Sequence, residues 1–322
     1  MRAYFPIAIA LGVLALAGGP AAAQDYPAKP VRVIVPFAVG GPADVFARVL
    51  GQHLGDALKQ PFVIDNKPGA GSVVGTAEAA KAAPDGYTLL MMSNTHTTNE
   101  SLVADKPFKL MRDFVGVAPV NASDLVLVAH PSLGAGTIKD LIALAKSKPG
   151  LLNYASSGTG TPYHMAGELF KAMSGTDILH VPFKGSSGAR NDVISGQVNL
   201  MFDSITTMGG NIEARQVVAL ATTGKSRSAV LPDVPTMAEA GVQGYEAVIW
   251  LGLMAPKGTP EAIVDRLNAE IARIVSRPEI KAAWIKLGAE PMRMTPAEFT
   301  AYLEADIEKW ARIVKISGAK AE

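Results

Sequence analysis

Four short segments rich in glycine, serine and threonine are the residues of this sequence best suited to chemistry. They are Gly40-Gly41-Pro42, Pro68-Gly69-Ala70-Gly71-Ser72, Ser156-Ser157-Gly158-Thr159-Gly160-Thr161 and Lys184-Gly185-Ser186-Ser187-Gly188. Each follows a short apolar run and precedes a helical pattern, and helix N-termini present free amide hydrogens to anions. Such amides bind a carboxylate without an arginine, because they supply both donors and positive potential. Ordinary tight turns are the alternative for any one segment, but the set together favours an anion site.

Several polar side chains could contact a ligand or serve only the fold. His96 belongs to the polar cluster Asn94 to Asn99, as a ligand contact or as a hydrogen-bonded loop histidine. Asp44 lies in the first turn of a helical pattern, where a carboxylate caps amides. Asp203 directly follows the apolar run Leu200 to Phe202. It would accept hydrogen bonds from a ligand amine or hydroxyl, or cap the helix that follows.

The motifs of common catalytic and metal sites are missing. The sequence contains no G-x-S-x-G, no H-E-x-x-H and no G-x-x-x-x-G-K-[ST], and its five histidines are scattered singly. It has no cysteine, which excludes disulfides, thiolate metal ligands and a cysteine nucleophile. Ser157 has no base in its local sequence. We therefore predict a binding protein without a cofactor, with a hydrolase as the least favoured alternative.

The elements that would position these residues alternate short β-branched runs with helical patterns, which is typical of βαβ units and a parallel sheet. We expect strands at Val31–Val35, Phe62–Asp65, Thr88–Met92, Leu125–Ala129, Asn153–Ala155, Ile178–Val181, Leu200–Phe202 and Val217–Ala221. We expect helices from Pro42 through Leu58, from Gly71 to Pro84, at Thr137–Lys148, Pro162–Met173 and Ser187–Ser195, and over most of Pro260–Ser317, with breaks at Pro278 and Pro296. Two consecutive blocks of this kind predict two α/β lobes.

The N-terminus has the features of a secretory signal peptide. Arg2 precedes the apolar run Phe5 to Ala17, and Ala21-Ala22-Ala23 supplies a small-residue cleavage site. The run is shorter than the roughly 20 residues of a membrane-spanning helix. We therefore predict that residues 1–23 are a signal peptide and that the protein is exported to the periplasm. Cleavage would leave 299 of the 322 residues (322 − 23), more than one core usually holds.

The charge balance argues against nucleic acid as a partner. Lysine and arginine total 30, aspartate and glutamate total 29, and the sequence has no basic tract. Binding to a phosphate backbone requires clustered positive charge. Small molecules and proteins remain as partners.

An ordered series of motifs resembles the Bug family, the TctC-like receptors of tripartite tricarboxylate transporters, over essentially the whole mature chain. The motifs are Val35 to Asp44, Asn66 to Gly71, Pro84 to Leu90, Asn153 to Gly158 with His164 to Phe170, His180 to Gly185, Gly196 to Val198 with Met201 to Asp203, and Pro235 to Gly241. The resemblance implies an α/β, two-lobed periplasmic-binding-protein (Venus-flytrap) fold. It also implies that two strands cross between the lobes and that the chain returns to the first lobe near Tyr245 to Trp250.

The resemblance implies a ligand cleft between a domain of residues 24–124 plus 246–322 and a domain of residues 125–245. There the Gly40-Gly41 loop and the Ser156 to Gly160 loop would hold one carboxylate, partly through ordered water, and Val39 would narrow one wall. The predicted ligand-binding residues are Phe37, Val39, Gly40, Gly41, Asp44, Gly69, Gly71, Asn94, His96, Ser156, Ser157, Gly158, Gly160, Thr161, His164, Lys184, Gly185 and Asp203.

The sequence thus predicts a monomeric periplasmic receptor that passes a small carboxylate to the membrane permease subunits of a tripartite transporter. Ligands of the family it resembles range over amino acids, dicarboxylates, citrate-like acids and aromatic acids. A receptor that feeds a sensor kinase instead of a permease is the alternative that this reasoning leaves open.

Overall fold

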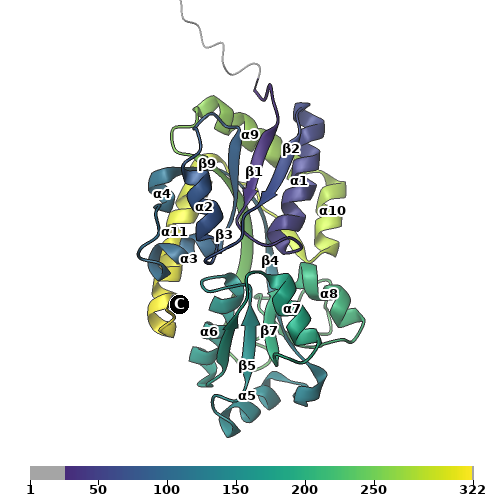
Figure 1. The fold of residues 1–322 in the computed structure, drawn as a ribbon. Helices are drawn as coiled ribbons and strands as arrows, with labels where there is room; N and C mark the ends of the chain where they lie inside the picture. Colours follow the sequence, from purple (N-terminus) through teal and green to yellow (C-terminus); the bar gives the residue numbers. More distant parts are fainter. Residues whose placement is uncertain (1–25, 321–322) are drawn as a thin grey trace, which may run out of the picture.

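The computed structural model describes residues 26–320, so the predicted signal peptide lies outside the described residues. Figure 1 shows two lobes, one above the other, joined by long strands at the centre. The strands are β1 (Val31–Val35), β2 (Phe62–Asn66), β3 (Thr88–Ser93), β4 (Phe114–Ala129), β5 (Asn153–Ser156), β6 (Leu179–Pro182), β7 (Leu200–Ser204), β8 (Val218–Thr222), β9 (Val248–Pro256) and β10 (Ala289–Pro291). They follow the order β2-β1-β3-β9-β4-β7-β5-β6, with β8 and β10 also paired to β4.

The helices fill the connections between these strands. They are α1 (Pro42–Leu58), α2 (Val73–Ala80), α3 (Asn94–Leu102), α4 (Leu110–Asp113), α5 (Ile138–Ser147), α6 (Pro162–Ser174), α7 (Ser186–Ile194), α8 (Ile205–Glu213), α9 (Glu261–Val275), α10 (Pro278–Lys286) and α11 (Pro296–Ser317). Pro278 and Pro296 each occupy the first turn of a new helix, where the missing amide hydrogen costs nothing. None of these helices has the length and apolar composition needed to cross a bilayer.

Strand β4 belongs to both lobes. Up to Asp124 it pairs antiparallel with β9, and from Leu125 onward it pairs with β7 and β8. Strand β9 makes the return crossing, because Ile249 packs in one apolar core and Leu251 in the other. We call residues 26–124 with 250–320 lobe 1 and residues 125–249 lobe 2. The predicted domain limits, at 124/125 and 245/246, stay a prediction.

In lobe 1 the sheet is buried on both faces, which explains its unbroken apolar strands. Along β3, Leu89 and Met91 join the cluster formed with α1, α9 and α10. Leu90 and Met92 join the cluster formed with α2 and α11. This alternation has the period of two expected for a strand. Lobe 2 repeats the scheme on β4, where Leu125 and Leu127 face one cluster and Val126 and Val128 face the other.

Three expectations about the elements were wrong. The polar cluster Asn94 to Asn99 is the start of α3 rather than a loop, because Ser93 and His96 form a capping box in which the Ser93 hydroxyl accepts from the Thr95 amide. The sheet is mixed rather than parallel, since β3 and β4 both pair antiparallel with β9. Leu125–Ala129 was expected as a separate strand and is instead the second part of β4.

Candidate ligand-binding site

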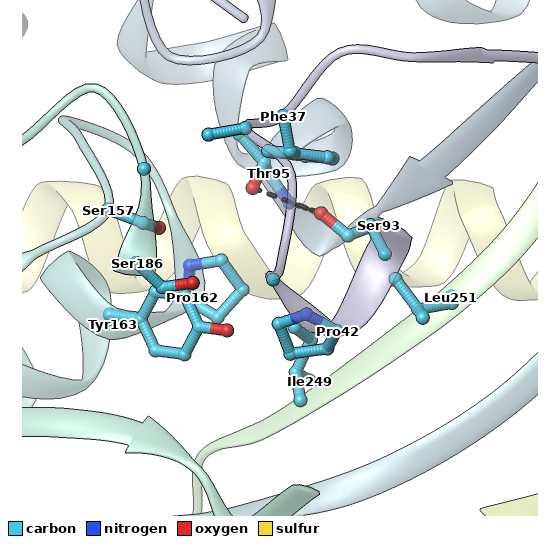
Figure 2. Close-up of a pocket in the computed structure, with 14 residues that line it drawn as sticks. Phe37, Pro42, Ser93, Thr95, Ser157, Pro162, Tyr163, Ser186, Ile249 and Leu251 are labelled. Atoms are coloured by element: carbon cyan, nitrogen blue, oxygen red, sulfur yellow. Dashed lines mark hydrogen bonds between the residues drawn. The ribbon is translucent and has the colours of Figure 1, made fainter. Parts of the chain in front are cut away.

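A cavity of about 30 Å³, here called the inner cavity, lies where the two lobes meet (Figure 2). Lobe 1, with its return strand β9, contributes Phe37, Ala38, Gly41, Pro42, Ala43, Ser93, Thr95 and Leu251, and lobe 2 contributes Ser157, Pro162, Tyr163, Gly185, Ser186 and Ile249. A cavity of this size holds about two to three water molecules. None of the described residues that line it carries a charged side chain.

The N-termini of α1, α3, α6 and α7 all point at the inner cavity, because each supplies lining residues from its cap or first turn. Helix α1 begins after Gly41 and α7 begins after Gly185, and neither glycine can cap its helix with a side chain. Their first amides are left to solvent or a ligand. Helix N-termini carry a partial positive charge of about half a unit. The cavity is therefore electropositive without a cationic side chain.

A larger opening of about 370 Å³, here called the outer pocket, adjoins the inner cavity and shares Phe37 and Ser157 with it. Its further residues include Gly69, Gly71, Ser72, Lys106, Gly158, Thr161 and Lys184. Phe37 and Ser157 therefore stand between a small enclosed space and a wider mouth. A ligand longer than the inner cavity would extend past these two side chains.

The lobes touch each other around the cavity, so this is a closed form of the cleft. The Ser187 hydroxyl of lobe 2 donates to the Val39 carbonyl of lobe 1 at 3.0 Å. A Cβ built on Gly71 would stand 2.4 Å from the carbonyl oxygen of Thr159. These contacts bring the Gly71 and Thr159 loops together, with the outer pocket as the opening beside them.

A network inside lobe 2 holds the Ser156 to Thr161 loop in place. The Ser156 hydroxyl accepts from the Gly158 amide at 3.1 Å and contacts Nε2 of His180 at 2.7 Å. The Thr161 hydroxyl donates to the Gly158 carbonyl at 2.6 Å. His180 stacks on His164 with ring centroids 4.1 Å apart. Burial lowers the pKa of His180 to about 3 and that of His164 to about 4, so both rings are neutral near pH 7.

Three of the predicted ligand-binding side chains make contacts within the protein. Asp44 accepts from the Gly40 amide at 3.0 Å and pairs with Arg48 at 2.8 Å. Burial raises the Asp44 pKa, but the hydrogen bonds from Arg48 and Gly40 outweigh it, and the pKa is lowered overall. His96 is fully buried, contacts Thr76 through Nε2 and packs edge-on against Phe37. Asn94 donates to the Val248 carbonyl at 2.9 Å.

Asp203 also lies behind the cavity wall. It is fully buried and accepts from Arg190 at 2.8 Å, from the Ser204 amide at 2.8 Å and from the Thr207 hydroxyl at 3.3 Å. Burial raises its pKa, and the nearby Arg190 acts in the opposite direction. The N-cap residue of α8 is Ser204, whose side chain accepts from the Thr206 amide, rather than Asp203. A ligand contact at Asp203 stays a prediction.

The predicted residues thus divide between the cavity walls and the layer behind them. Those that line the inner cavity or the outer pocket are Phe37, Gly41, Gly69, Gly71, Ser157, Gly158, Thr161, Lys184 and Gly185. Those that line neither are Val39, Gly40, Asp44, Asn94, His96, Ser156, Gly160, His164 and Asp203. The predicted list omitted Tyr163, which directly precedes His164, and it omitted Ser186, although Ser186 belongs to one of the four glycine-rich segments. It also did not include Ile249 and Leu251, because both belong to the apolar strand β9 and an apolar run does not indicate a ligand site.

Comparison with known proteins identifies the family. The sequence matches the family described as "Tripartite tricarboxylate transporter family receptor" over residues 46–319. The chain belongs to this receptor family. Protein BugT of Bordetella pertussis is 38% identical to it over 303 residues, which cover 94% of this chain and 93% of that protein. The predicted family is therefore confirmed.

Solved structures of the same type are closely similar. An R. palustris protein with adipate superposes with a TM-score of 0.89 at 33% identity, covering 92% of this chain and 99% of that chain. The periplasmic binding protein BugD gives 0.87 at 33% identity, covering 92% and 100%. MatC from Rhodopseudomonas palustris, with bound malate, gives 0.85 at 31% identity, covering 90% and 100%.

These similarities confirm the predicted two-lobed periplasmic-binding-protein fold. They also confirm the prediction of a TctC/Bug-type solute-binding protein rather than an enzyme, because the family and the similar structures are receptors and binding proteins.

Proposed function

We propose that this receptor works in the periplasm, where it closes its lobes on a small carboxylate and delivers it to the membrane subunits of a tripartite transporter. The main support for an anionic ligand is that the N-termini of four helices, from both lobes, meet at the inner cavity. None of the described residues that line this cavity has a charged side chain. Converging helix N-termini favour an anion. The adipate and malate bound by two similar proteins support a carboxylate.

In this proposal the carboxylate accepts hydrogen bonds from first-turn amides of both lobes. Gly41 of lobe 1 and Gly185 of lobe 2 both line the cavity and have no side chain to obstruct an anion. The Ser157 and Ser186 hydroxyls lie on one side of the cavity (Figure 2). Amides held rigidly by helices lose little freedom on binding, so a neutral wall can still select an anion. Delivery to a permease rests on family membership.

The direct test compares acids with their neutral analogues. The mature protein is screened by thermal shift with carboxylic acids and with the matching primary amides, which have nearly the same shape but no charge. A ligand at 100 times its dissociation constant stabilises the folded state by about 2.7 kcal/mol, which gives a shift of several degrees. We expect acids to shift the melting temperature and amides to leave it unchanged. An equal response to both would contradict an anion site.

A further inference from the structure

The Tyr163 hydroxyl is a buried polar group without a hydrogen-bond partner among residues 26–320. Tyr163 is only 3% exposed, lies in the first turn of α6 and lines the inner cavity. In Figure 2 its hydroxyl points across the cavity toward Pro42 and Ile249. Buried hydroxyls are almost always hydrogen-bonded, and a native exception calls for an explanation such as a bound ligand.

A second donor without a partner among the described residues belongs to Arg190, whose charge acts on this hydroxyl. Arg190 follows Ser186 by one helical turn on α7, and its Nε donates to Asp203 while its buried Nη2 has no partner within the described chain. Burial raises the pKa of the Tyr163 hydroxyl well above its usual value, Asp203 raises it further and Arg190 lowers it. Tyr163 therefore stays protonated near pH 7 and can donate a hydrogen bond.

The Ser157 and Ser186 hydroxyls also line the inner cavity, and the function proposed above places them beside the carboxylate. On the rest of the wall, the Ser93 hydroxyl is already bonded to Thr95, and the side chains of Phe37, Pro42 and Leu251 present only carbon. A ligand whose far end is purely apolar would leave the Tyr163 hydroxyl unpaired in the closed cleft. A ligand with an oxygen at that end would satisfy it.

Building on the carboxylate function proposed above, we propose that Tyr163 determines specificity by donating a hydrogen bond to a second oxygen of the ligand. The preferred solute is then an acid with a hydroxyl, carbonyl or second carboxyl group in addition to the carboxylate held by the helix N-termini. Sites built to bond a substrate oxygen reject the analogue that lacks it far more strongly than apolar pockets reject an extra methylene.

The experiment measures dissociation constants by calorimetry for pairs of acids with equal carbon number, with and without a second oxygen. The pairs are propionate and lactate, butyrate and succinate, and hexanoate and adipate. In the wild type we expect the oxygen-bearing member of at least one pair to bind tenfold or more tightly, roughly the loss of one hydrogen bond to a buried group. In Tyr163→Phe we expect that ratio to fall to about threefold or less, with the plain acid unaffected.

The melting temperature of the same variant is a second measurement, because the Tyr163 hydroxyl that it removes has no protein partner among residues 26–320. Ligand-free Tyr163→Phe should melt at the wild-type temperature or above it, since a buried unsatisfied group has been removed. Tyr154→Phe is the matched control. The Tyr154 hydroxyl donates to Glu168 of the same lobe at 2.7 Å. Tyr154 lines neither the inner cavity nor the outer pocket. That variant should melt lower and keep the wild-type ratio.

Two results would contradict this proposal. An unchanged ratio in Tyr163→Phe overturns the proposal, and so does an equal loss for both members of a pair, because the phenol would then hold the common carboxylate. If the wild type binds none of these acids, nor any in the acid and amide screen, the carboxylate function fails as well, and that result is obtained without any variant.

Discussion

Gly185 of lobe 2 lies directly against Ala38 of lobe 1, and a Cβ added to Gly185 would stand 2.4 Å from the Ala38 Cβ. The three nearest atoms that this Cβ would meet all belong to Ala38. Gly185 has a φ of 173°, an extended conformation that any residue adopts. An alanine there is therefore acceptable to lobe 2 alone and collides only with the other lobe. The lobes can approach this closely because residue 185 is a glycine and has no Cβ.

Gly185→Ala should hold the lobes apart and weaken ligand binding by about tenfold or more, because only the closed fraction of molecules binds fully. The dissociation constant is measured by calorimetry with an acid found in the screen. Small-angle scattering should show a larger radius of gyration for the ligand-saturated variant than for the ligand-saturated wild type. The melting temperature without ligand should stay close to that of the wild type.

Ala38→Gly provides the control, because it removes the atom with which the new methyl collides. The double variant Ala38→Gly/Gly185→Ala should regain most of the lost affinity, as residues in direct contact are expected to be coupled. Failure of the double variant to recover, or wild-type binding by Gly185→Ala alone, would show that this contact does not limit closure.

A second prediction separates backbone from side-chain recognition. Gly158 has a φ of +124°, and a Cβ there would stand 3.2 Å from the Phe183 carbonyl, so Gly158→Val should distort the loop and abolish binding. Lys184 lines the outer pocket but is exposed, and Lys67 pairs with Asp65 at the surface. Lys184→Ala and Lys67→Ala should each weaken binding by less than about fivefold. Loss of all binding in either lysine variant would mean that an ion pair holds the anion.

The sequence predicted the local elements well, because their signals are local. Proline in the first turn and glycine shortly before it indicated the starts of α1 and α6, and short apolar runs indicated strands in both lobes. It did not predict that β4 continues from Phe114 through both lobes. Pairing of β4 with β9 joins residues more than 120 positions apart. No local sequence pattern indicates which distant strand will pair with β4.

The site was predicted at the level of loops but not of side chains. Ser157 and Gly185 were identified because small residues before a helix are a general sign of anion binding. Tyr163 was missed because one tyrosine after a proline resembles any core aromatic residue. Asp203 was selected because it directly follows the expected strand Leu200–Phe202, yet in the structure its side chain pairs with Arg190 on α7. Which way a side chain points at the end of a strand depends on tertiary contacts.

The third prediction concerns this ion pair. Asp203→Ala should lower the free energy of unfolding by about 3 to 5 kcal/mol, because it leaves the Arg190 charge buried without its partner. Arg190 is 13% exposed and Asp203 is fully buried, so water cannot replace the lost contact. Urea unfolding followed by circular dichroism measures the loss.

The double variant Asp203→Leu/Arg190→Met tests whether the unpaired Arg190 charge causes this loss of stability. Replacing both members of a buried pair by apolar residues is often neutral or stabilising. The double variant should therefore be more stable than Asp203→Ala. If Asp203→Ala keeps wild-type stability and loses only ligand affinity, Asp203 contacts the ligand and its place behind the wall has been misinterpreted.

The fourth prediction is a loss of stability in acid that originates in the stacked pair His164 and His180. Their pKa values in the folded protein, about 4 and about 3, lie below the unfolded value of about 6.5. The unfolded chain therefore binds more protons between pH 6.5 and pH 3, and stability falls as the pH decreases through this range. Each histidine contributes a slope of at most about 1.4 kcal/mol per pH unit.

Unfolding free energies of the wild type and of His180→Gln at pH 7 and pH 4.5 measure this effect. The difference between the two pH values should be smaller in His180→Gln, because one titrating group has been removed while a polar side chain remains near Ser156. His53→Gln, on α1 and outside this network, should leave the difference as in the wild type. Equal pH dependence in all three proteins would exclude the histidine stack as its source.

The last prediction concerns Asp124, the residue at which β4 leaves its pairing with β9 and enters lobe 2. Burial, together with the charges of Glu290 and Glu246, raises its pKa to about 6. Because this value lies above the unfolded value of about 3.9, the folded state binds more protons between these two pH values. The stability associated with the neutral carboxyl is present below about pH 4 and is lost as the pH rises to 6.

Asp124→Asn should therefore be more stable than the wild type at pH 7, by about 1 to 3 kcal/mol for this partly exposed group. At pH 4 the wild-type carboxyl is itself neutral in the folded protein, and the two proteins should have nearly equal stability. Asp56→Asn, an exposed site on α1, is the control and should show no pH-dependent gain. Urea unfolding at both pH values decides the matter: an Asp124→Asn variant that is less stable than the wild type at pH 7 would mean that the charged carboxylate supports the junction between the lobes.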